Sequence, residues 1–308
     1  MSLDVLAAGE LYVDLVMSGF DFWPQPGQEA FAREFRREIG GGAAITACGL
    51  AALGRRTGVF GIVGGDHHAW ITGRFQERGV ETDRIAIDAA EPTAFTVAVS
   101  APQDRAFFTY LGANRGLPQA LTAAARGPLE AHHVHLALAP DWETARALFD
   151  AIHANGATVS LDAGWHEGWL ADPRAVETIS KLDIFFPNET EAARMTGETD
   201  PERMLRRFAE AGARCVAVKL GAAGAALLRD SEIYFEKPPA VTPCDTTGAG
   251  DCFDAGFLDA WMRGESAQVC LRTANICGAL SCEAYGGIDG FPSSARLAQE
   301  LEKLACKR

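Results

Sequence analysis

The residues best suited to chemistry form the run DTTGAGD at 245–251, directly before an apolar helical pattern. That helix is predicted to begin near Gly248, and its apolar face is marked by Phe253, Phe257 and Trp261. Small residues at a helix start leave backbone N–H groups open, and with the helix dipole they form an anion site. Asp251 falls in the first turn beside that anion. A carboxylate there suits a general base that takes a proton from a hydroxyl attacking phosphorus. The alternative interpretation is an ordinary N-capping turn.

Three other segments place glycine or acidic residues at the end of an element. Residues 40–44, GGGAA, enter a helix and could bring backbone against a ligand, although close helix–strand packing explains them equally well. Residues 188–191, NETE, follow a buried strand. Asn188 and Glu191 fit a capping box, or the handling of phosphate and of Mg²⁺ through water. Residues 219–224, KLGAAG, predict a glycine turn between two strands that could also cradle a nucleotide.

The sequence lacks the motifs of several other classes of enzyme. There is no Gly-Lys dipeptide for a Walker phosphate loop, no GxSxG, and no GxGxxG after the first apolar run, which argues against a dehydrogenase. His133 and His135 alternate on one strand and could hold a metal, but ordinary strand packing is favoured. The eight cysteines include no CxxC pair, and we interpret them as small buried hydrophobes in a reducing cytoplasm.

Composition limits the class of protein. A chain of 308 residues allows two domains, or one large α/β domain with an attachment. The net charge of −13 argues against nucleic acid and anionic membranes as partners but leaves room for a small phosphorylated ligand. The segment MSLDVLAAGE lacks the basic region of a signal peptide, and no apolar run reaches the ~18 residues of a membrane span. We therefore expect a cytoplasmic protein.

The elements that must position these residues alternate along the chain. Short apolar runs predict buried strands, and segments with helical apolar spacing lie between them. This alternation implies βαβ units and a mostly parallel sheet covered on both faces. After Gly248 the chain is predicted to be helical to its end. The expected strands are Val5–Ala8, Thr57–Ile62, His133–Leu138, Ala157–Leu161, Ile184–Phe186 and Cys215–Leu220; the expected helices are Ala43–Leu53, Ala69–Arg78, Glu143–Ala154, Glu189–Thr196 and Pro201–Ala211.

Two stretches interrupt this alternation. Residues 11–38 contain LYVDLVM, a turn rich in Pro and Gly, and FAREFRREI. Residues 92–115 contain TAFTVAVS, a polar turn at Pro102–Arg105, and AFFTYLGAN, which is a hairpin pattern. We expect the two stretches to pair into one small sheet beside the main domain. Such a sheet needs cover from substrate, the main domain or a second subunit, because it exposes Phe20, Phe22, Trp23, Phe107 and Phe108.

Together these segments resemble the PfkB, or ribokinase-like, carbohydrate kinases over nearly the whole chain. DTTGAGDCFDAGFL at 245–258 is similar to the second signature of that family, and GGGAAITACGLAALG at 40–54 to the first. The segments GIVGGD, RAFFTYLGAN, NETE and KLGAAG follow in the family's order. The resemblance implies a three-layer αβα domain with a central, mostly parallel sheet, and a small β-sheet lid. Residues 1–10, 39–91 and 116–308 would form the main domain, and residues 11–38 and 92–115 the lid.

The resemblance also implies transfer of the γ-phosphate of ATP, with Mg²⁺, to a hydroxyl of a sugar or nucleoside, in a homodimer joined through the lid. Asp251 would be the catalytic base, and Gly248, Ala249 and Gly250 the anion hole. The acceptor would meet Asp14, Gly41, Gly42, Ile45 and Asn114. ATP would meet Asn188, Lys219, Gly221, Gly224, Thr246 and Asn275; Glu191 would hold Mg²⁺ through water, and Asp245 and Thr247 a monovalent cation such as K⁺.

Two departures from the family pattern fall on the acceptor side. Ile45 stands where the first signature usually carries an Asn that contacts the sugar. Residues 162–166, DAGWH, lack the Asn and Arg of the corresponding family segment. The leading hypothesis is a kinase of a small sugar or sugar-like acceptor. A nucleoside is the alternative, because lost polar side chains could accommodate an apolar ring. A catalytically silent sugar sensor is a third hypothesis, against which the complete 248–251 loop argues.

Overall fold

A computed structural model describes the chain except for residues 1, 102–103, 125–126, 128–129 and 306–308. Its large sheet has nine strands in the order β13-β12-β11-β10-β9-β8-β1-β4-β5. Pairing is parallel from β5 to β11 and antiparallel at β12 and β13. The strands are β1 Leu3–Gly9, β4 Thr57–Gly64, β5 Glu81–Asp88, β8 Ala131–Ala137, β9 Thr158–Asp162, β10 Ile184–Phe185, β11 Cys215–Lys219, β12 Ala225–Arg229 and β13 Glu232–Glu236.

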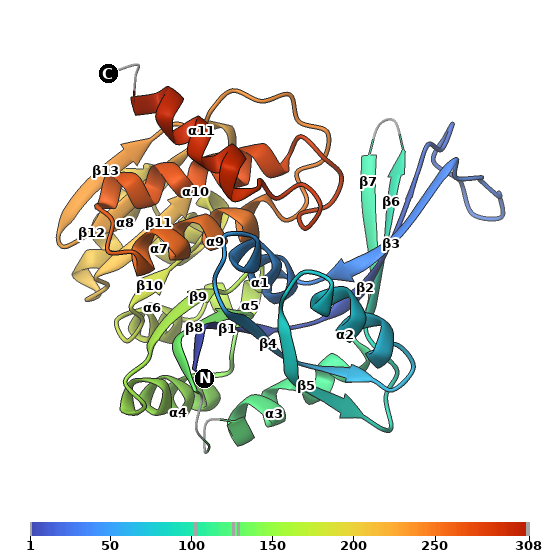
Figure 1. The fold of residues 1–308 in the computed structure, drawn as a ribbon, viewed down its shortest axis with the longest axis horizontal. Helices are drawn as coiled ribbons and strands as arrows, with labels where there is room; N and C mark the ends of the chain where they lie inside the picture. Colours follow the sequence, from blue (N-terminus) through green and yellow to red (C-terminus); the bar gives the residue numbers. More distant parts are fainter. Residues whose placement is uncertain (1, 102–103, 125–126, 128–129, 306–308) are drawn as a thin grey trace.

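Helices cover both faces of this sheet, which completes the three expected layers (Figure 1). One apolar core lies under α3 Leu117–Ala124, α4 Trp142–Ala154, α6 Pro173–Ile179, α7 Glu189–Thr196 and α8 Pro201–Glu210. The cores of the other face lie under α1 Gly42–Ala52, α2 His68–Gln76, α9 Ala249–Met262 and α10 Ala267–Ser281. Buried strands with near-continuous apolar sequence are what a sheet covered on both sides requires.

A separate sheet of four strands is built from the two insertions, as expected. Its order is β3-β2-β6-β7, and it projects to one side of the body (Figure 1). β2 pairs in parallel with β6 and antiparallel with β3, and β6 pairs antiparallel with β7. In the expected turn at Pro102–Arg105, residues 102–103 lie outside the described residues. The strands are β2 Tyr12–Ser18, β3 Glu34–Gly40, β6 Phe95–Ala101 and β7 Asp104–Tyr110.

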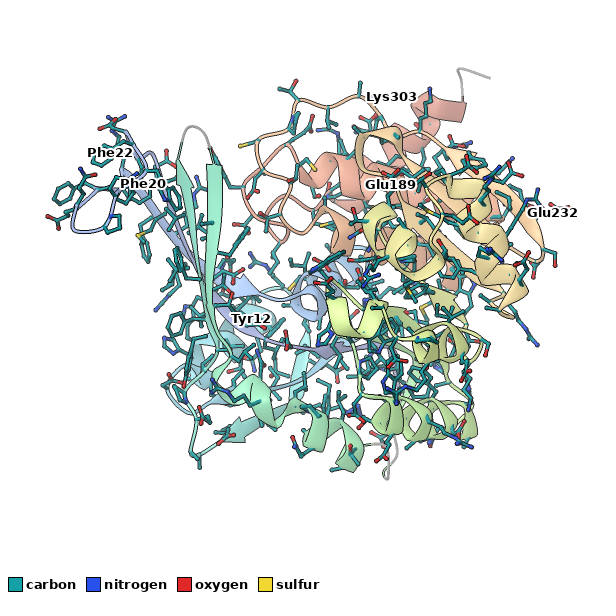
Figure 2. The ribbon with its side chains drawn as sticks, turned by 180° about the vertical axis from the view of Figure 1, so that it is seen from behind. Tyr12, Phe20, Phe22, Glu189, Glu232 and Lys303 are labelled. Carbon is teal, nitrogen blue, oxygen red and sulfur yellow. The ribbon has the colours of Figure 1, made fainter. Side chains whose placement is uncertain are left out.

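Several elements differ from the sequence prediction. The amphipathic strands β5 and β13 were not expected, since both are partly exposed and lack a continuous apolar run. The chain after Gly248 is not helical throughout, because loops separate α9, α10 and α11 Ser294–Ala305. Phe20, expected to be exposed, is buried, whereas Phe22 beside it is not (Figure 2). Unexpected short helices also occur, at α5 Glu167–Leu170 and in the turns Gly112–Gly116 and Gly221–Ala223.

The histidines at 133 and 135 pack inside the large sheet, and most of the described cysteines are buried. His133 is hydrogen-bonded to Thr158 at 2.7 Å and to Ser160 at 2.8 Å, and His135 to Ser160 at 2.8 Å, so the imidazoles pack between β8 and β9. Within the described residues, neither histidine belongs to a group that could share a metal ion. Of the described cysteines only Cys244 is exposed; Cys306 lies outside them. No helix in the described part of the chain is long and apolar enough to cross a membrane.

Candidate active site

The turn before α9 has the conformation that its glycines permit. Gly248 is the N-cap of α9, with φ at 73°, in the left-handed region that favours glycine. A Cβ at this position would lie 2.7 Å from Ile45 Cδ1 and 2.9 Å from Gly287 Cα. Ala249 and Gly250 follow in the first turn, and a Cβ at Gly250 would lie 3.4 Å from Lys219 Nζ. Small residues are therefore needed for the close packing around this helix N-terminus.

Asp251 lies in the first turn of α9 and faces the turn that precedes α1. A Cβ at Gly42 would lie 2.7 Å from Asp251 Oδ1, so glycine allows the two segments to meet. The hydroxyl of Thr46 donates to the backbone carbonyl of Asp251 at 3.3 Å, which fixes α1 against α9. Burial and the charge of Asp162 raise the pKa of Asp251 to about 7, although Lys219 acts in the opposite direction. A carboxylate with this pKa is suited to accept a proton near neutral pH.

A cluster of two acids and an ammonium lies next to Asp251. Lys219 Nζ is 2.6 Å from Asp162 Oδ2 and 3.3 Å from Asp254 Oδ1. One oxygen from each of Asp162, Asp251 and Asp254 lies within 4.8 Å of the others. The ammonium lowers the pKa of Asp162 despite burial, whereas burial raises the pKa of Asp254 well above its ordinary value. We call Asp162, Lys219 and Asp254 the lysine cluster.

A cavity of about 500 Å³ adjoins the N-terminus of α9. Its walls are the turn between β11 and β12, the loop from Lys237 to Thr246, and one face of α10. Gly224 has φ at 101°, and a Cβ there would lie 2.1 Å from the carbonyl oxygen of Glu236, so this wall also requires glycine. Asn275 donates from Nδ2 to that same carbonyl at 2.9 Å. Seven residues predicted to meet ATP or the anion line the cavity: Lys219, Gly221, Gly224, Thr246, Ala249, Gly250 and Asn275.

Asn188 and Glu191 form the complete capping box of α7. Asn188 Oδ1 accepts from the Glu191 N–H at 2.9 Å, and Glu191 Oε2 accepts from the Asn188 N–H at 2.8 Å. Asn188 Nδ2 also donates to Glu191 Oε1 at 2.7 Å. Neither residue lines the cavity. The backbone of Asn188 pairs in parallel with that of Lys219 in an isolated β-bridge. Burial and the charge of Asp162 raise the pKa of Glu191, although Lys219 and the bonds to Asn188 act in the opposite direction.

Asp245 forms hydrogen bonds with Thr247 in the same turn and with Gly286 in the loop after α10. Asp245 Oδ1 accepts from the N–H of Thr247 at 3.0 Å and from its hydroxyl at 2.7 Å. Asp245 Oδ2 accepts from the N–H of Gly286 at 3.0 Å. The 245–251 turn is thereby tied to the loop that follows α10.

The residues expected on the acceptor side lie in different surroundings. Asp14 of β2 lies against Gly40, where a Cβ would be 2.1 Å from its carboxylate. Gly41, with φ at 101°, is the N-cap of α1. Asn114 is buried, and its side-chain amide bonds both backbone groups of Leu11, at 3.1 and 3.3 Å. Ile45 is also buried, in an apolar core and against Gly248 and Gly287. Asn114 therefore fixes Leu11, the residue before β2 of the small sheet. Ile45 packs beneath residues 248–250, which we call the anion turn.

A family model described as "pfkB family carbohydrate kinase" matches residues 3–294. The chain belongs to the PfkB family. The resemblance drawn from the sequence is thus confirmed, and the protein is a phosphotransferase that acts on a hydroxyl group.

Relatives of this PfkB kinase match it along most of their length. It is 33% identical over 292 residues to an ATP-dependent ribose-1-phosphate kinase from Halopiger xanaduensis, with 92% of this chain and 93% of the relative covered. It is 30% identical over 284 residues to a 2-dehydro-3-deoxygluconokinase from Bacillus subtilis, with 87% of each covered. The structure of Arabidopsis thaliana ribokinase complexed with ribose and ATP is similar, with a TM-score of 0.82, 26% identity, and 98% and 99% of the two chains covered.

Two acids of this PfkB site were not singled out from the sequence. Asp162 ends β9, and only its segment was noted, for lacking Asn and Arg. Asp254 follows Asp251 by three residues on α9, so it lies one turn along the same side of the helix. From this spacing of three residues, Asp254 could have been predicted to lie near Asp251. The contacts of these acids with Lys219 were not predictable, because that of Asp162 depends on the strand order β9-β10-β11 and that of Asp254 on the packing of α9 against β11.

Proposed function

We propose that this PfkB kinase transfers the γ-phosphate of ATP to a hydroxyl of a small sugar or sugar-like acceptor, with Asp251 as general base and residues 248–250 as a glycine-rich anion hole. The position of Asp251 carries the proposal. Its carboxylate lies at the N-terminus of α9, with the cavity of about 500 Å³ on one side and the Gly40–Gly42 turn on the other. A base between the two substrates is the arrangement that in-line phosphoryl transfer requires.

The proposed reaction uses residues whose positions are described above. Asp251 takes the proton of the acceptor hydroxyl as that oxygen forms its bond to the γ-phosphorus, and the bond between this phosphorus and ADP breaks. Backbone N–H groups of Ala249 and Gly250 are proposed to stabilise the transferred phosphoryl group, helped by the dipole of α9; the Ala249 N–H would first leave its 3.3 Å bond to the Thr246 carbonyl. The Asp251 proton then passes to solvent. Asp14 is proposed to bind acceptor hydroxyls from the lid, beside the turn of Gly41 and Gly42.

Mg²⁺ fits this site when held through water. Both carboxylate oxygens of Glu191 already accept hydrogen bonds from Asn188, so direct coordination would have to displace them. A water-mediated contact keeps them, and Mg²⁺ retains several waters readily. When bound, Mg²⁺ would neutralise charge on the ATP phosphates. Asp245 and Thr247 offer oxygen ligands suited to K⁺ at the outer side of the turn, and we propose them as a monovalent-cation site.

The acceptor is tested by following ADP release with a panel of ribose, fructose, ribose-1-phosphate, 2-dehydro-3-deoxygluconate and nucleosides. The relatives named above fit a sugar-like acceptor, and the apolar packing of Ile45 fits acceptors with fewer hydroxyls. We expect a phosphorylated or deoxygenated sugar to exceed ribose in kcat/KM. The nucleoside hypothesis is supported if a nucleoside gives the highest value. No turnover with any acceptor, together with ATP binding, would favour the silent sensor.

Position 45 is expected to influence the choice of acceptor. Ile45→Asn would add an amide next to Gly248, and we expect it to favour polyhydroxylated sugars over deoxygenated ones by about 1 kcal/mol if the amide bonds the acceptor. The measurement is the ratio of kcat/KM for ribose to that for the best wild-type acceptor. Ile45→Val, which removes only a methylene, is the matched packing control. An unchanged ratio, with a lower Tm, would assign Ile45 to packing alone.

The lid is proposed to join two subunits. Phe35 and Phe108 are 63% and 60% exposed, and strand pairing places both on the lid face opposite Asp14. An acceptor bound at Asp14 cannot cover that face. Figure 2 shows that the lid also carries Phe22 at its outer end, far from Tyr12 at the base. An uncovered apolar sheet of this kind is a candidate interface.

Light scattering after size-exclusion chromatography is expected to give the mass of a dimer at micromolar concentration. The variant with Phe35→Ser and Phe108→Ser should shift the mass to that of a monomer, because its lid face is polar. The control is Phe235→Ser, which replaces a phenylalanine that is 54% exposed on β13 of the large sheet, and it should leave the dimer unchanged. A monomeric wild-type protein, or equal masses for all three proteins, would contradict the lid interface.

A further inference from the structure

Asp254 is a fully buried acid that touches neither described substrate region directly. It has no exposed surface. It is also absent from the lining of the cavity of about 500 Å³ proposed to bind ATP, which we call the nucleotide cavity. It lies on α9 one turn after Asp251, and its two carboxylate oxygens are 3.3 and 3.5 Å from Lys219 Nζ. A buried carboxyl is costly unless it is paired or neutral, so this residue requires an explanation.

Lys219 connects this acid to the place where phosphate is expected. Its Nζ lies below the anion turn, 3.4 Å from where a Cβ at Gly250 would be, and the same residue lines the nucleotide cavity. An ammonium carries three N–H donors on a flexible stem, and it can be aimed only by its partners. The 2.6 Å bond to Asp162 fixes one direction, and the contact with Asp254 fixes a second.

The charges of the lysine cluster balance when Asp254 is neutral. One ammonium then faces one carboxylate, Asp162, and Asp254 adds no charge. The environment favours this state, because burial and then the charge of Asp162, opposed by Lys219, raise the pKa of Asp254 well above its ordinary value. One oxygen of Asp254 also lies within 4.8 Å of one oxygen of Asp162, and two carboxyl groups this close in a buried site favour a proton on one of them.

We propose that Asp254 is a positioning residue: a neutral acid that clamps Lys219 beneath the anion turn, without adding negative charge where the ATP phosphates arrive. This inference rests on the proposed function. It predicts that the shape and hydrogen bonds of the side chain matter, whereas its capacity to ionise does not. Asp251, one turn away on the same helix, is proposed to have the opposite requirement.

Two variants with the same number of side-chain heavy atoms as Asp separate these requirements. Asp254→Asn keeps an oxygen for Lys219 and offers an N–H to Asp162, whereas Asp254→Leu keeps the branched shape, is bulkier, and has no polar atom. We expect kcat/KM for ATP of the Asp254→Asn variant to stay within about tenfold of the wild-type value. In the Asp254→Leu variant it should fall about 10²-fold, the effect of displacing a positioned group. Folding of each variant is checked by circular dichroism and thermal unfolding. If the Leu variant does not fold, Asp254→Ala replaces it, and the Ala variant should show the same loss of kcat/KM.

Binding measurements give a readout that a purely structural role would not move. Equilibrium titration with ATP and with AMP should show that Asp254→Leu weakens ATP selectively, because Lys219 acts on the terminal phosphates. Equal loss for both nucleotides, full activity in the Leu and Ala variants, or an Asn variant as impaired as Leu would overturn the proposal. If the wild-type protein phosphorylates no acceptor, the proposed function fails, while the ratio of ATP to AMP affinities still decides the role of Asp254.

Discussion

Replacing Asp251 by Asn is expected to lower kcat by about 10²–10⁴-fold, the range that a general base contributes. The substitution keeps the size of the side chain and the start of α9, while it removes the group that accepts the acceptor proton. ATP affinity should change little, because Asp251 is absent from the lining of the nucleotide cavity. The measurements are kcat from ADP release and the ATP dissociation constant from equilibrium titration.

The pH profile supplies a second measure of the same role. Since the pKa of Asp251 is raised to about 7, kcat/KM for the acceptor should fall as the pH falls through this value and the carboxylate becomes protonated. A raised acid pKa also means that the folded state favours the protonated form, so the corresponding stability is fully present below the unfolded-state value of about 3.9 and is lost as the pH rises to about 7. The Asn variant should lose both dependences.

Asp254→Asn is the matched control for this experiment, because it makes the same substitution one turn along the same helix. Near-normal turnover of the Asp251 variant would remove this residue from the mechanism. Equal, severe losses in both variants would show instead that any change in this part of α9 disrupts the site.

The sequence predicted the parts of the site that depend on local structure. A helix N-terminus made of small residues has open N–H groups wherever it lies in a fold, so the 248–251 turn was recognisable from its own residues. The same holds for the capping box of Asn188 and Glu191 and for the glycine turn after Lys219, both of which the structure contains. These features involve residues separated by only a few positions.

The remainder depends on contacts between distant segments. Lys219 meets Asp162 across 57 positions, and two strand pairings separate them in the sheet. Asn114 bonds the backbone of Leu11, 103 positions away, a contact that no local pattern indicates. Phe20 appears exposed by its polar neighbours, and only the tertiary structure buries it. Side-chain partners of this kind follow from strand order and loop packing, which local patterns do not encode.

Replacing Lys219 by Met is expected to lower the free energy of unfolding at pH 7 by about 3–5 kcal/mol, the effect of leaving one member of a buried ion pair without its partner. Met has nearly the same length, so little volume is lost. Asp162 would remain, with its side chain only 12% exposed and without the ammonium 2.6 Å away. ATP affinity should also fall, because Lys219 lines the nucleotide cavity.

The loss should depend on pH with a definite sign. In the wild-type protein, burial raises the pKa of Asp162, but the ammonium of Lys219 outweighs burial and holds this pKa below its ordinary value. The stability from this lowered pKa is present above the unfolded-state value of about 3.9 and is lost as the pH falls. In Lys219→Met, burial is no longer opposed by the ammonium, so the pKa of Asp162 rises and the variant should recover stability as the pH falls from 7 towards 5.

A double variant isolates the charge as the cause. Lys219→Met combined with Asp162→Asn removes both ions, and we expect it to regain most of the stability lost in the single variant, because two neutral groups of similar volume replace the pair. Urea denaturation of the wild-type protein, both single variants and the double variant gives the coupling energy directly. If Lys219→Met lost under about 1 kcal/mol at pH 7, as exposed pairs do, the lysine cluster would be too weakly coupled to hold Lys219 beneath the anion turn.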